Sequence, residues 1–196
     1  MRVGLMLLAV VALAHAADSQ TLATESADAP EPAAPAPVAA APADVASPEA
    51  IVRAVHRSIS GTAVAHFDFG RFRSLFLDDG KVGAAGQETR AEPPHIMYKS
   101  VAAWIGENQE ARNRIGLDEK IIAMRVSRFG NIASVFYTHD VEVTDGGKTT
   151  RYQTANVAQL VFDGRRWWVA SLIWNVSPDP DTLPDGLEGK DPSAGS

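Results

Sequence analysis

The sequence predicts an α+β domain in which short helices precede a curled antiparallel sheet. Two observations lead to this prediction. Apolar residues recur every three or four positions over residues 48–76, as they do on the buried side of a helix. From residue 120 onward, Val, Ile, Phe, Tyr and Trp fill four runs that are separated by glycine-containing turns, a pattern typical of a meander of strands.

The first predicted helix begins at Pro48, with Ser47 as its capping residue. Ile51, Val55 and Ile59 follow at intervals of four and form its apolar stripe. Serine before a proline is a common start of a helix, because the hydroxyl accepts from a free backbone N–H and proline has none to satisfy. His56 on this helix and His95 farther along the chain are expected to face solvent, and neither is assigned a role.

Two further helices are expected before the sheet. Asp68 caps a short helix from Phe69 to Phe76, and the turn residues that follow stop it. A third helix is predicted from about Met97 to Ile115, with Tyr98 one turn from the apolar residues of its inner stripe.

The predicted meander has four strands, which run from Lys120 to Arg128, Ile132 to Val143, Thr149 to Phe162 and Arg165 to Val176. Gly146-Gly147 and Asp163-Gly164 are expected to be two-residue hairpin loops. With such loops, Tyr137 lies opposite Asn156 and Asn156 lies opposite Ser171, whereas a slip of one residue would exchange the two faces of a strand.

This register places four polar side chains on one otherwise apolar face of the sheet, and Tyr98 of the third helix is expected to close over them. Apolar walls with a few convergent polar groups are typical of small-molecule sites. The predicted ligand-binding residues are therefore Tyr98, Tyr137, His139, Asn156 and Ser171.

The opposite face of the predicted sheet carries large apolar residues that would form an exposed patch on a monomer. Such a patch usually marks an interface, and we expect a homodimer. The predicted interface residues are Phe136, Trp168, Leu172 and Trp174.

The chain divides into four segments. Residues 1–16 form a signal peptide, with Arg2 before an apolar run and Ala-His-Ala at its end. Residues 17–47 form a disordered low-complexity linker rich in alanine and proline, 48–177 form the folded domain, and 178–196 form an acidic, Pro- and Gly-rich disordered tail. The protein is therefore expected to be periplasmic or secreted, with no stable membrane anchor after cleavage of the signal.

Composition excludes several kinds of function. The chain has no cysteine, so it has no disulfide, zinc–thiolate site or thiol nucleophile. The net charge of −6 comes from the terminal segments, and the nearly neutral domain has no basic stripe that would bind nucleic acid. His66 and Asp68 are two potential metal ligands, but no third is fixed nearby. Neither a metal nor a cofactor is predicted.

Three runs of the sequence, 67–76, 125–136 and 158–174, resemble the nuclear-transport-factor-2-like (NTF2-like) superfamily and, more narrowly, its SnoaL-like members of unassigned activity. The Asp-Gly-Arg-Arg-Trp-Trp-Val run that begins at Asp163 is the most specific part. The resemblance covers about residues 48–177. It implies a cone in which a strongly curved sheet wraps the helices around a pocket, and dimerisation through the outer face of the sheet. Its members include isomerases, cyclases, dehydratases, ligand binders and scaffolds, so the fold does not choose a function.

One activity in this superfamily can be tested against the residues. Its ketosteroid isomerases need an acidic base in an apolar pocket. The predicted inner face carries no Asp or Glu, because Asp140 and Glu142 fall on the other face and Asp68 caps a helix. The sequence therefore does not predict an isomerase.

The leading functional hypothesis is an exported domain that binds a small, largely apolar ligand in its pocket. One alternative is an enzyme that uses His139 for proton transfer, with its other catalytic residues unknown. Another is a non-catalytic dimerisation or interaction module. An open pocket favours the first two hypotheses, and a pocket filled by its own side chains favours the third.

Overall fold

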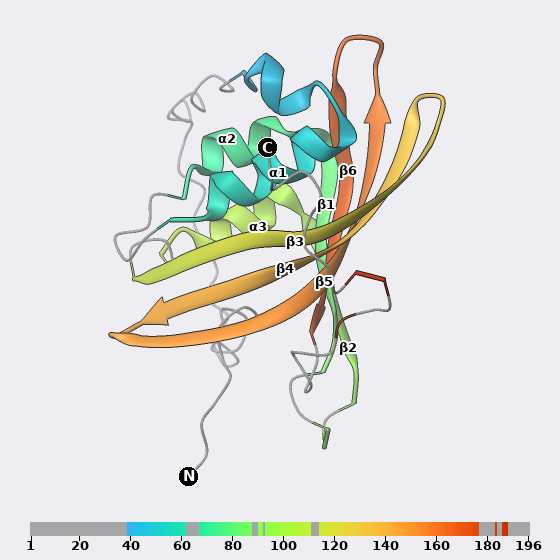
Figure 1. The fold of residues 1–196 in the computed structure, drawn as a ribbon. Helices are drawn as coiled ribbons and strands as arrows, with labels where there is room; N and C mark the ends of the chain where they lie inside the picture. Colours follow the sequence, from blue (N-terminus) through green and yellow to red (C-terminus); the bar gives the residue numbers. More distant parts are fainter. Residues whose placement is uncertain are drawn as a thin grey trace, which may run out of the picture.

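In the computed structural model, the described residues form a six-stranded curved sheet that wraps around three α-helices (Figure 1). The structure describes residues 39–61, 67–87, 90–91, 93–110, 114–176, 183 and 186–187. The predicted signal peptide and most of the predicted linker lie outside these residues. Among the described residues, no helix has the length and apolar character needed to cross a membrane.

The first helix is confirmed, and the second is confirmed except that it ends at Ser74 rather than at Phe76. Helix α1 spans Pro48–Ile59, and the Ser47 hydroxyl accepts from the backbone N–H of Ala50 at 3.1 Å. Helix α2 spans Phe69–Ser74, and the Asp68 carboxylate caps it by accepting from the backbone N–H of the third residue of the helix at 2.8 Å. Both caps satisfy N–H groups that have no partner within their helix.

The third helix is shorter than predicted. Helix α3 spans only Val101–Asn108, and the residues before it, His95–Ser100, form strand β2. Tyr98 therefore lies on a strand and is 53% exposed. The prediction failed because β2 is stabilised by pairing with β1 (Phe76–Gly86), a separate strand of the sheet. The local period of apolar residues does not reveal such a partner.

The predicted four-stranded meander is confirmed, but it is only part of the sheet. Its strands are β3 (Ile115–Phe129), β4 (Ile132–Asp145), β5 (Lys148–Phe162) and β6 (Trp167–Val176). The sheet order is β2-β1-β6-β5-β4-β3, with β1 and β6 parallel and every other pair antiparallel.

A glycine permits the close approach of β1 to β6. Gly86 has φ of +136°, and a Cβ atom there would lie 1.8 Å from the carbonyl oxygen of Val176. Any other residue would be strained in this conformation and would clash with the neighbouring strand. The two strands can therefore remain paired to their ends only with glycine at this position.

The end of the predicted linker belongs to the folded domain. Residues Pro42–Val45 form a 3-10 helix, η1, and Asp44 in it is buried. The Asp44 carboxylate accepts from Arg57 at 2.9 Å and from Arg71 at 2.6 Å, which ties η1 to α1 and α2. Burial raises the pKa of Asp44, but the hydrogen bonds and charges of the two arginines outweigh burial and hold it below its ordinary value.

The turns explain where the predicted register holds and where it fails. Gly146-Gly147 is a two-residue loop, so Tyr137 pairs with Asn156 as expected. The connection between β5 and β6 is instead four residues long, because Phe162 pairs with Trp167. Within it, the Asp163 carboxylate accepts from the backbone N–H groups of the two following arginines at 2.8 Å.

Two β-bulges exchange the faces of β3 and β6. Pairing of β3 with β4 shifts by one residue at Ile122, and pairing of β6 with β5 shifts between Val169 and Ser171. An extra residue in one strand inverts the alternation of all residues beyond it. Glu119 therefore turns inward on β3, and Leu172 turns inward on β6.

The C-terminal tail covers part of the outer face of the sheet. Leu187 is only 2% exposed, and its carbonyl oxygen accepts from the Thr138 hydroxyl of β4 at 2.7 Å. Thr138 is fully buried although it lies between Tyr137 and His139, which face inward. The middle of β4 is thus covered on both faces.

Candidate functional site

Five polar side chains meet on the concave side of the sheet, and we call them the polar cluster: His56, Glu119, Tyr137, His139 and Asn156. They come from α1, β3, β4 and β5. The residues His56, Tyr137, His139 and Asn156 are each no more than 4% exposed, and the Glu119 side chain is 6% exposed. Such a group of buried polar residues is unusual inside an apolar core and needs a physical explanation.

A chain of hydrogen bonds joins four members of the polar cluster. The Asn156 amide donates to the Tyr137 hydroxyl at 3.2 Å. That hydroxyl donates in turn to His56 Nε2 at 2.6 Å, and His56 Nδ1 donates to the Glu119 carboxylate at 2.6 Å. With an ionised Glu119, this direction gives every group in the chain a consistent role, with His56 protonated on Nδ1.

The surroundings of these groups shift their pKa values in different directions. Burial raises the pKa of Glu119, but the neighbouring imidazoles of His56 and His139, with the hydrogen bond from His56, outweigh burial and hold that pKa below its ordinary value. Burial lowers the pKa of His139 to about 4, against the opposing effect of the Glu119 charge. Burial raises the pKa of Tyr137 far above its ordinary value. At neutral pH the cluster therefore holds a carboxylate, a neutral His139 and a protonated phenol.

Four buried polar atoms have no hydrogen-bond partner among the described residues: His139 Nδ1, His139 Nε2, Asn156 Oδ1 and Trp174 Nε1. Asn156 and Trp174 are register partners across β5 and β6, so their side chains are neighbours on one face. An unpartnered buried polar atom costs about 1–3 kcal/mol. These atoms make the polar cluster suited to receive a group that the chain itself does not supply.

Aromatic rings from several elements gather next to Trp174. The rings of Trp174 and Trp104 meet edge to face, with centroids 6.5 Å apart, and Trp104 in turn contacts Phe69 and Phe72. These rings come from β6, α3 and α2. Trp174 Nε1 therefore belongs to a ring within an aromatic group, the kind of contact that flat molecules favour.

The structure brings three of the five predicted ligand-binding residues together: Tyr137, His139 and Asn156. Ser171 pairs with the exposed Gln159 and lies on the outer side, because the bulge in β6 precedes it. Tyr98 lies on β2 and is exposed, so it does not close over the cluster. The expectation that all five side chains converge is wrong for these two residues.

The sequence analysis missed two members of the polar cluster. His56 follows Val52 by four residues and precedes Ile59 by three, which is the spacing of the buried side of α1. That signal was present in the sequence, and the expectation that His56 faces solvent is wrong because the side chain is buried. The inward carboxylate of Glu119 could not be found in this way, because the bulge at Ile122 decides its face. The statement that the inner face has no acidic residue is corrected accordingly.

The predicted interface residues separate into two pairs. Leu172 and Trp174 pack with the core, so they are not part of an outer patch. Phe136 and Trp168 are partly exposed, and their strand partners Val157 and Val161 share the outer side with them. Only two of the four predicted interface residues therefore lie on the outer side of the sheet.

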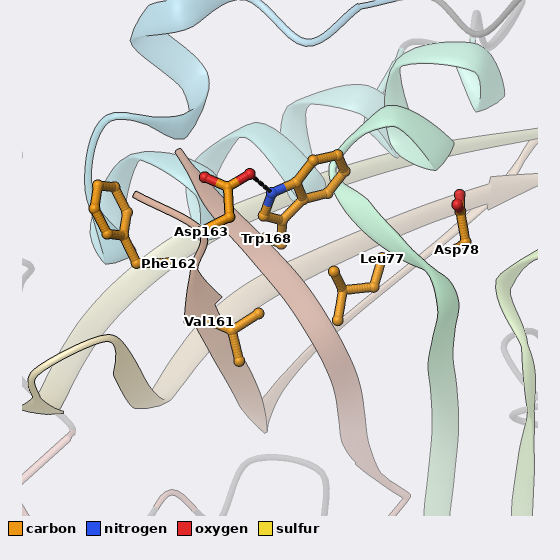
Figure 2. Close-up of a pocket in the computed structure, with 6 residues that line it drawn as sticks. All are labelled: Leu77, Asp78, Val161, Phe162, Asp163 and Trp168. Atoms are coloured by element: carbon orange, nitrogen blue, oxygen red, sulfur yellow. Dashed lines mark hydrogen bonds between the residues drawn. The ribbon is translucent and has the colours of Figure 1, made fainter. Parts of the chain in front are cut away.

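A pocket of about 300 Å³ lies on the surface near the β5–β6 turn, and Figure 2 shows its lining residues. The Trp168 indole donates to the Asp163 carboxylate at 2.7 Å, across one side of this pocket. That bond, together with backbone N–H groups of the turn, lowers the pKa of Asp163 to about 2. The Arg166 guanidinium stacks 3.6 Å from the Trp168 ring centroid. These contacts stabilise the hairpin, and the pocket is separate from the polar cluster.

Comparison with solved structures identifies the fold. A putative aromatic ring hydroxylase from Novosphingobium aromaticivorans has a TM-score of 0.51 and 10% identity over 69% of this chain and 87% of that chain. A ketosteroid isomerase-like protein from Erwinia carotovora atroseptica has a TM-score of 0.46 and 15% identity over 67% and 95% of the two chains. An NTF2-like protein with a cystatin-like fold from N. aromaticivorans has a TM-score of 0.43 and 16% identity over 62% and 72%.

The fold is NTF2-like. The fold that the sequence resemblance implied is thereby confirmed, and at these identities the likeness shows nothing beyond the fold. No protein-family model matches the chain, and no curated protein matches it. The function of this NTF2-like domain must therefore be argued from its own residues.

Proposed function

We propose that this NTF2-like domain binds a small, largely apolar molecule inside its cone, against the polar cluster and Trp174. The observation that supports this most is the set of four buried polar atoms that have no hydrogen-bond partner among the described residues. A ligand that satisfies them would recover part of the desolvation cost, about 1–3 kcal/mol for each atom. The aromatic rings beside them offer the apolar contact that such ligands need.

The neighbouring pair Asn156 and Trp174 indicates which polar group the ligand carries. Asn156 Oδ1 can only accept a hydrogen bond, and Trp174 Nε1 can only donate one. One hydroxyl group can donate to the first atom and accept from the second at the same time. The ligand that fits best is therefore a flat apolar molecule with one hydroxyl.

The indole resonances of the chain test this proposal. The chain has four tryptophans, so a ¹⁵N-labelled sample gives four indole N–H signals, and Trp174→Phe assigns one of them. The probe is 2-naphthol, with naphthalene as the matched compound that lacks the hydroxyl. We expect 2-naphthol to move the Trp174 signal and to bind about 10-fold or more tightly than naphthalene.

Two variants control this experiment. Asn156→Leu should weaken 2-naphthol binding, whereas Trp168→Phe, on the outer side of β6, should leave it unchanged. The proposal fails if the Trp174 signal stays in place while another indole signal moves, or if naphthalene binds as tightly as 2-naphthol.

A second candidate function is proton transfer at the same cluster. It is supported by the hydrogen-bonded chain from Tyr137 through His56 to Glu119, an arrangement that can move a proton over several atoms. His139, whose ring nitrogens have no partner among the described residues, remains the candidate base. The apolar ketone 2-tetralone in D₂O provides a test, because the wild type should accelerate deuterium exchange at its acidic C–H and His139→Leu should not. Equal rates for the two proteins would exclude this function.

Export and self-association are separate proposals. We propose that residues 1–16 are removed and that the mature chain begins at Ala17, outside the cytoplasm. N-terminal sequencing of exported protein that still begins with Met1 would contradict this.

We also propose a homodimer through the outer side of the sheet, where Phe136 and Trp168 are partly exposed. Light scattering that gives the same mass for wild type and Trp168→Glu would contradict it.

A further inference from the structure

Three metal-ligating side chains of the polar cluster lie close together: His56, Glu119 and His139. The potential ligand atoms of these residues all lie within 4.8 Å of one another. His56 Nδ1 is 2.6 Å from Glu119 Oε2, and His139 Nδ1 is 3.9 Å from Glu119 Oε1. The residues come from α1, β3 and β4, so three separate elements converge on one point.

Contacts among the described residues do not explain why the His139 side chain is buried. Its side chain is 3% exposed, and neither ring nitrogen has a hydrogen-bond partner among the described residues. Buried polar groups almost always have a partner. A buried imidazole that faces a carboxylate and a second imidazole has surroundings typical of a metal ligand.

We propose that His56, Glu119 and His139 bind one divalent transition-metal ion, such as Zn²⁺ or Fe²⁺. Two imidazoles and one carboxylate form a ligand set that both ions accept, with further coordination positions left open. This proposal goes beyond the proposed function, because the ion can bind when no organic ligand is present. It also differs from the expectation from the sequence, in which no metal was assigned because His66 and Asp68 had no third ligand fixed nearby.

The distances are compatible with such a site after small side-chain movements. Ligand atoms around a tetrahedral Zn²⁺ lie about 3.3–3.5 Å apart, given bonds of about 2.0–2.2 Å. The contact between His56 and Glu119 must therefore lengthen, and His139 must move closer to Glu119, by roughly 1 Å or less in each case. These changes require rotation of the Glu119 carboxylate and small movements of the two imidazole rings, whose ligand atoms lie within 4.8 Å of the other ligand atoms. One negative carboxylate with two neutral imidazoles then neutralises half of the charge of the ion.

The outer contacts of His56 fit the role of an oriented ligand. A metal-bound histidine usually donates its other ring N–H to a fixed acceptor. His56 Nε2 already lies 2.6 Å from the Tyr137 hydroxyl, which Asn156 holds from its other side. With the ion on His56 Nδ1, Nε2–H donates to Tyr137, and the Tyr137 hydroxyl donates to Asn156 once the amide turns over. That rotation gives Asn156 Oδ1 the partner that it lacks.

Calorimetric titration of ZnCl₂ into the full chain tests the proposal, with a chain that carries no histidine tag and that has been freed of metal by EDTA. We expect one Zn²⁺ per chain. His139→Gln and Glu119→Gln should each weaken binding by about 100-fold or more, because each removes one ligand. Tyr137→Phe keeps all three ligands and should weaken binding by about 10- to 100-fold, the usual effect of losing the group that orients a ligand. His95→Gln is the matched control, because His95 is exposed on β2.

X-ray absorption of the zinc-loaded wild type gives a second measurement that does not depend on whether a variant folds. We expect nitrogen and oxygen ligands only, including two imidazoles, at about 2.0–2.2 Å. The proposal is overturned if the wild type binds no Zn²⁺, if the absorption data show fewer than two imidazoles, or if His95→Gln lowers the affinity as much as His139→Gln does. Movement of the Trp174 indole signal by 2-naphthol in the presence of EDTA would support the proposed function independently of this result.

Discussion

Replacement of His139 by leucine should stabilise the metal-free protein, although it removes a residue that we assign to the functional site. In the wild type, two ring nitrogens are buried without a partner among the described residues. Each such atom costs about 1–3 kcal/mol, and leucine fills a similar volume with apolar atoms. The loss of the 3.9 Å approach to Glu119 offsets a small part of the gain. We expect His139→Leu to raise the free energy of unfolding by about 1–2 kcal/mol.

Urea denaturation in EDTA, followed by circular dichroism, measures this effect. With a slope of about 1–3 kcal/mol per molar urea, the midpoint should rise by roughly 0.3–2 M. Tyr137→Phe is the matched control, because its hydroxyl serves both His56 and Asn156, and its loss should destabilise the protein by about 1–3 kcal/mol. If His139→Leu is instead destabilised by more than about 1 kcal/mol, the histidine has a structural partner in the folded protein. The reasoning would then be refuted.

Zinc should reverse the order of the two proteins. An ion that binds only the folded wild type stabilises it by about 2.7 kcal/mol at a concentration 100 times the dissociation constant. The variant lacks one ligand and should gain much less. A wild type that becomes more stable than His139→Leu only when zinc is added would show that the histidine is retained for binding rather than for folding.

Three further changes test other parts of the structure. Asp44→Asn should lower the free energy of unfolding by about 1–2 kcal/mol at neutral pH, a modest value because its arginine partners are partly exposed. The pKa of Asp44 is held below its ordinary value of 3.8. This stabilisation is therefore fully present above about pH 4 and should vanish as the pH falls through the lowered pKa. An equal effect of Asp44→Asn at pH 2 and pH 7 in urea titrations would contradict it. Leu187→Ala should release the tail from Thr138 and speed proteolysis of the tail by trypsin, whereas unchanged cleavage would show that the contact does not hold the tail. Gly86→Ala should destabilise the domain by about 2–4 kcal/mol, because its Cβ would meet the carbonyl of Val176, and an unchanged melting temperature would contradict this.

The sequence predicted those parts of the fold that depend on local patterns. The caps at Ser47 and Asp68 locate α1 and α2, and the Gly146-Gly147 turn sets the pairing of Tyr137 with Asn156. The same turn places His139 on the inner side, so three of the five residues of the polar cluster follow from local chemistry. Patterns of this kind involve residues that are adjacent in the chain or directly opposed across a hairpin.

The rest of the site depends on features that only tertiary structure determines. The bulges at Ile122 and before Ser171 each insert one residue, and nothing in the local sequence marks them. They turn Glu119 and Trp174 inward and Ser171 outward, which changes the chemistry of the site from hydroxyl groups to a carboxylate and an indole. Strand β2 was missed for a related reason, since its pairing with β1 cannot be read from a single segment.

A crystal structure of the full chain, isolated from its native source without chelator, tests most directly whether the polar cluster is a binding site. We expect electron density next to His139, Asn156 and Trp174, within about 2.0–3.2 Å of the polar atoms that have no partner among the described residues. An ion would be recognised by its anomalous signal, and an organic ligand by its shape beside Trp104. A structure in which these side chains hydrogen-bond to one another or to the rest of the chain, with no additional density among them, would contradict the account.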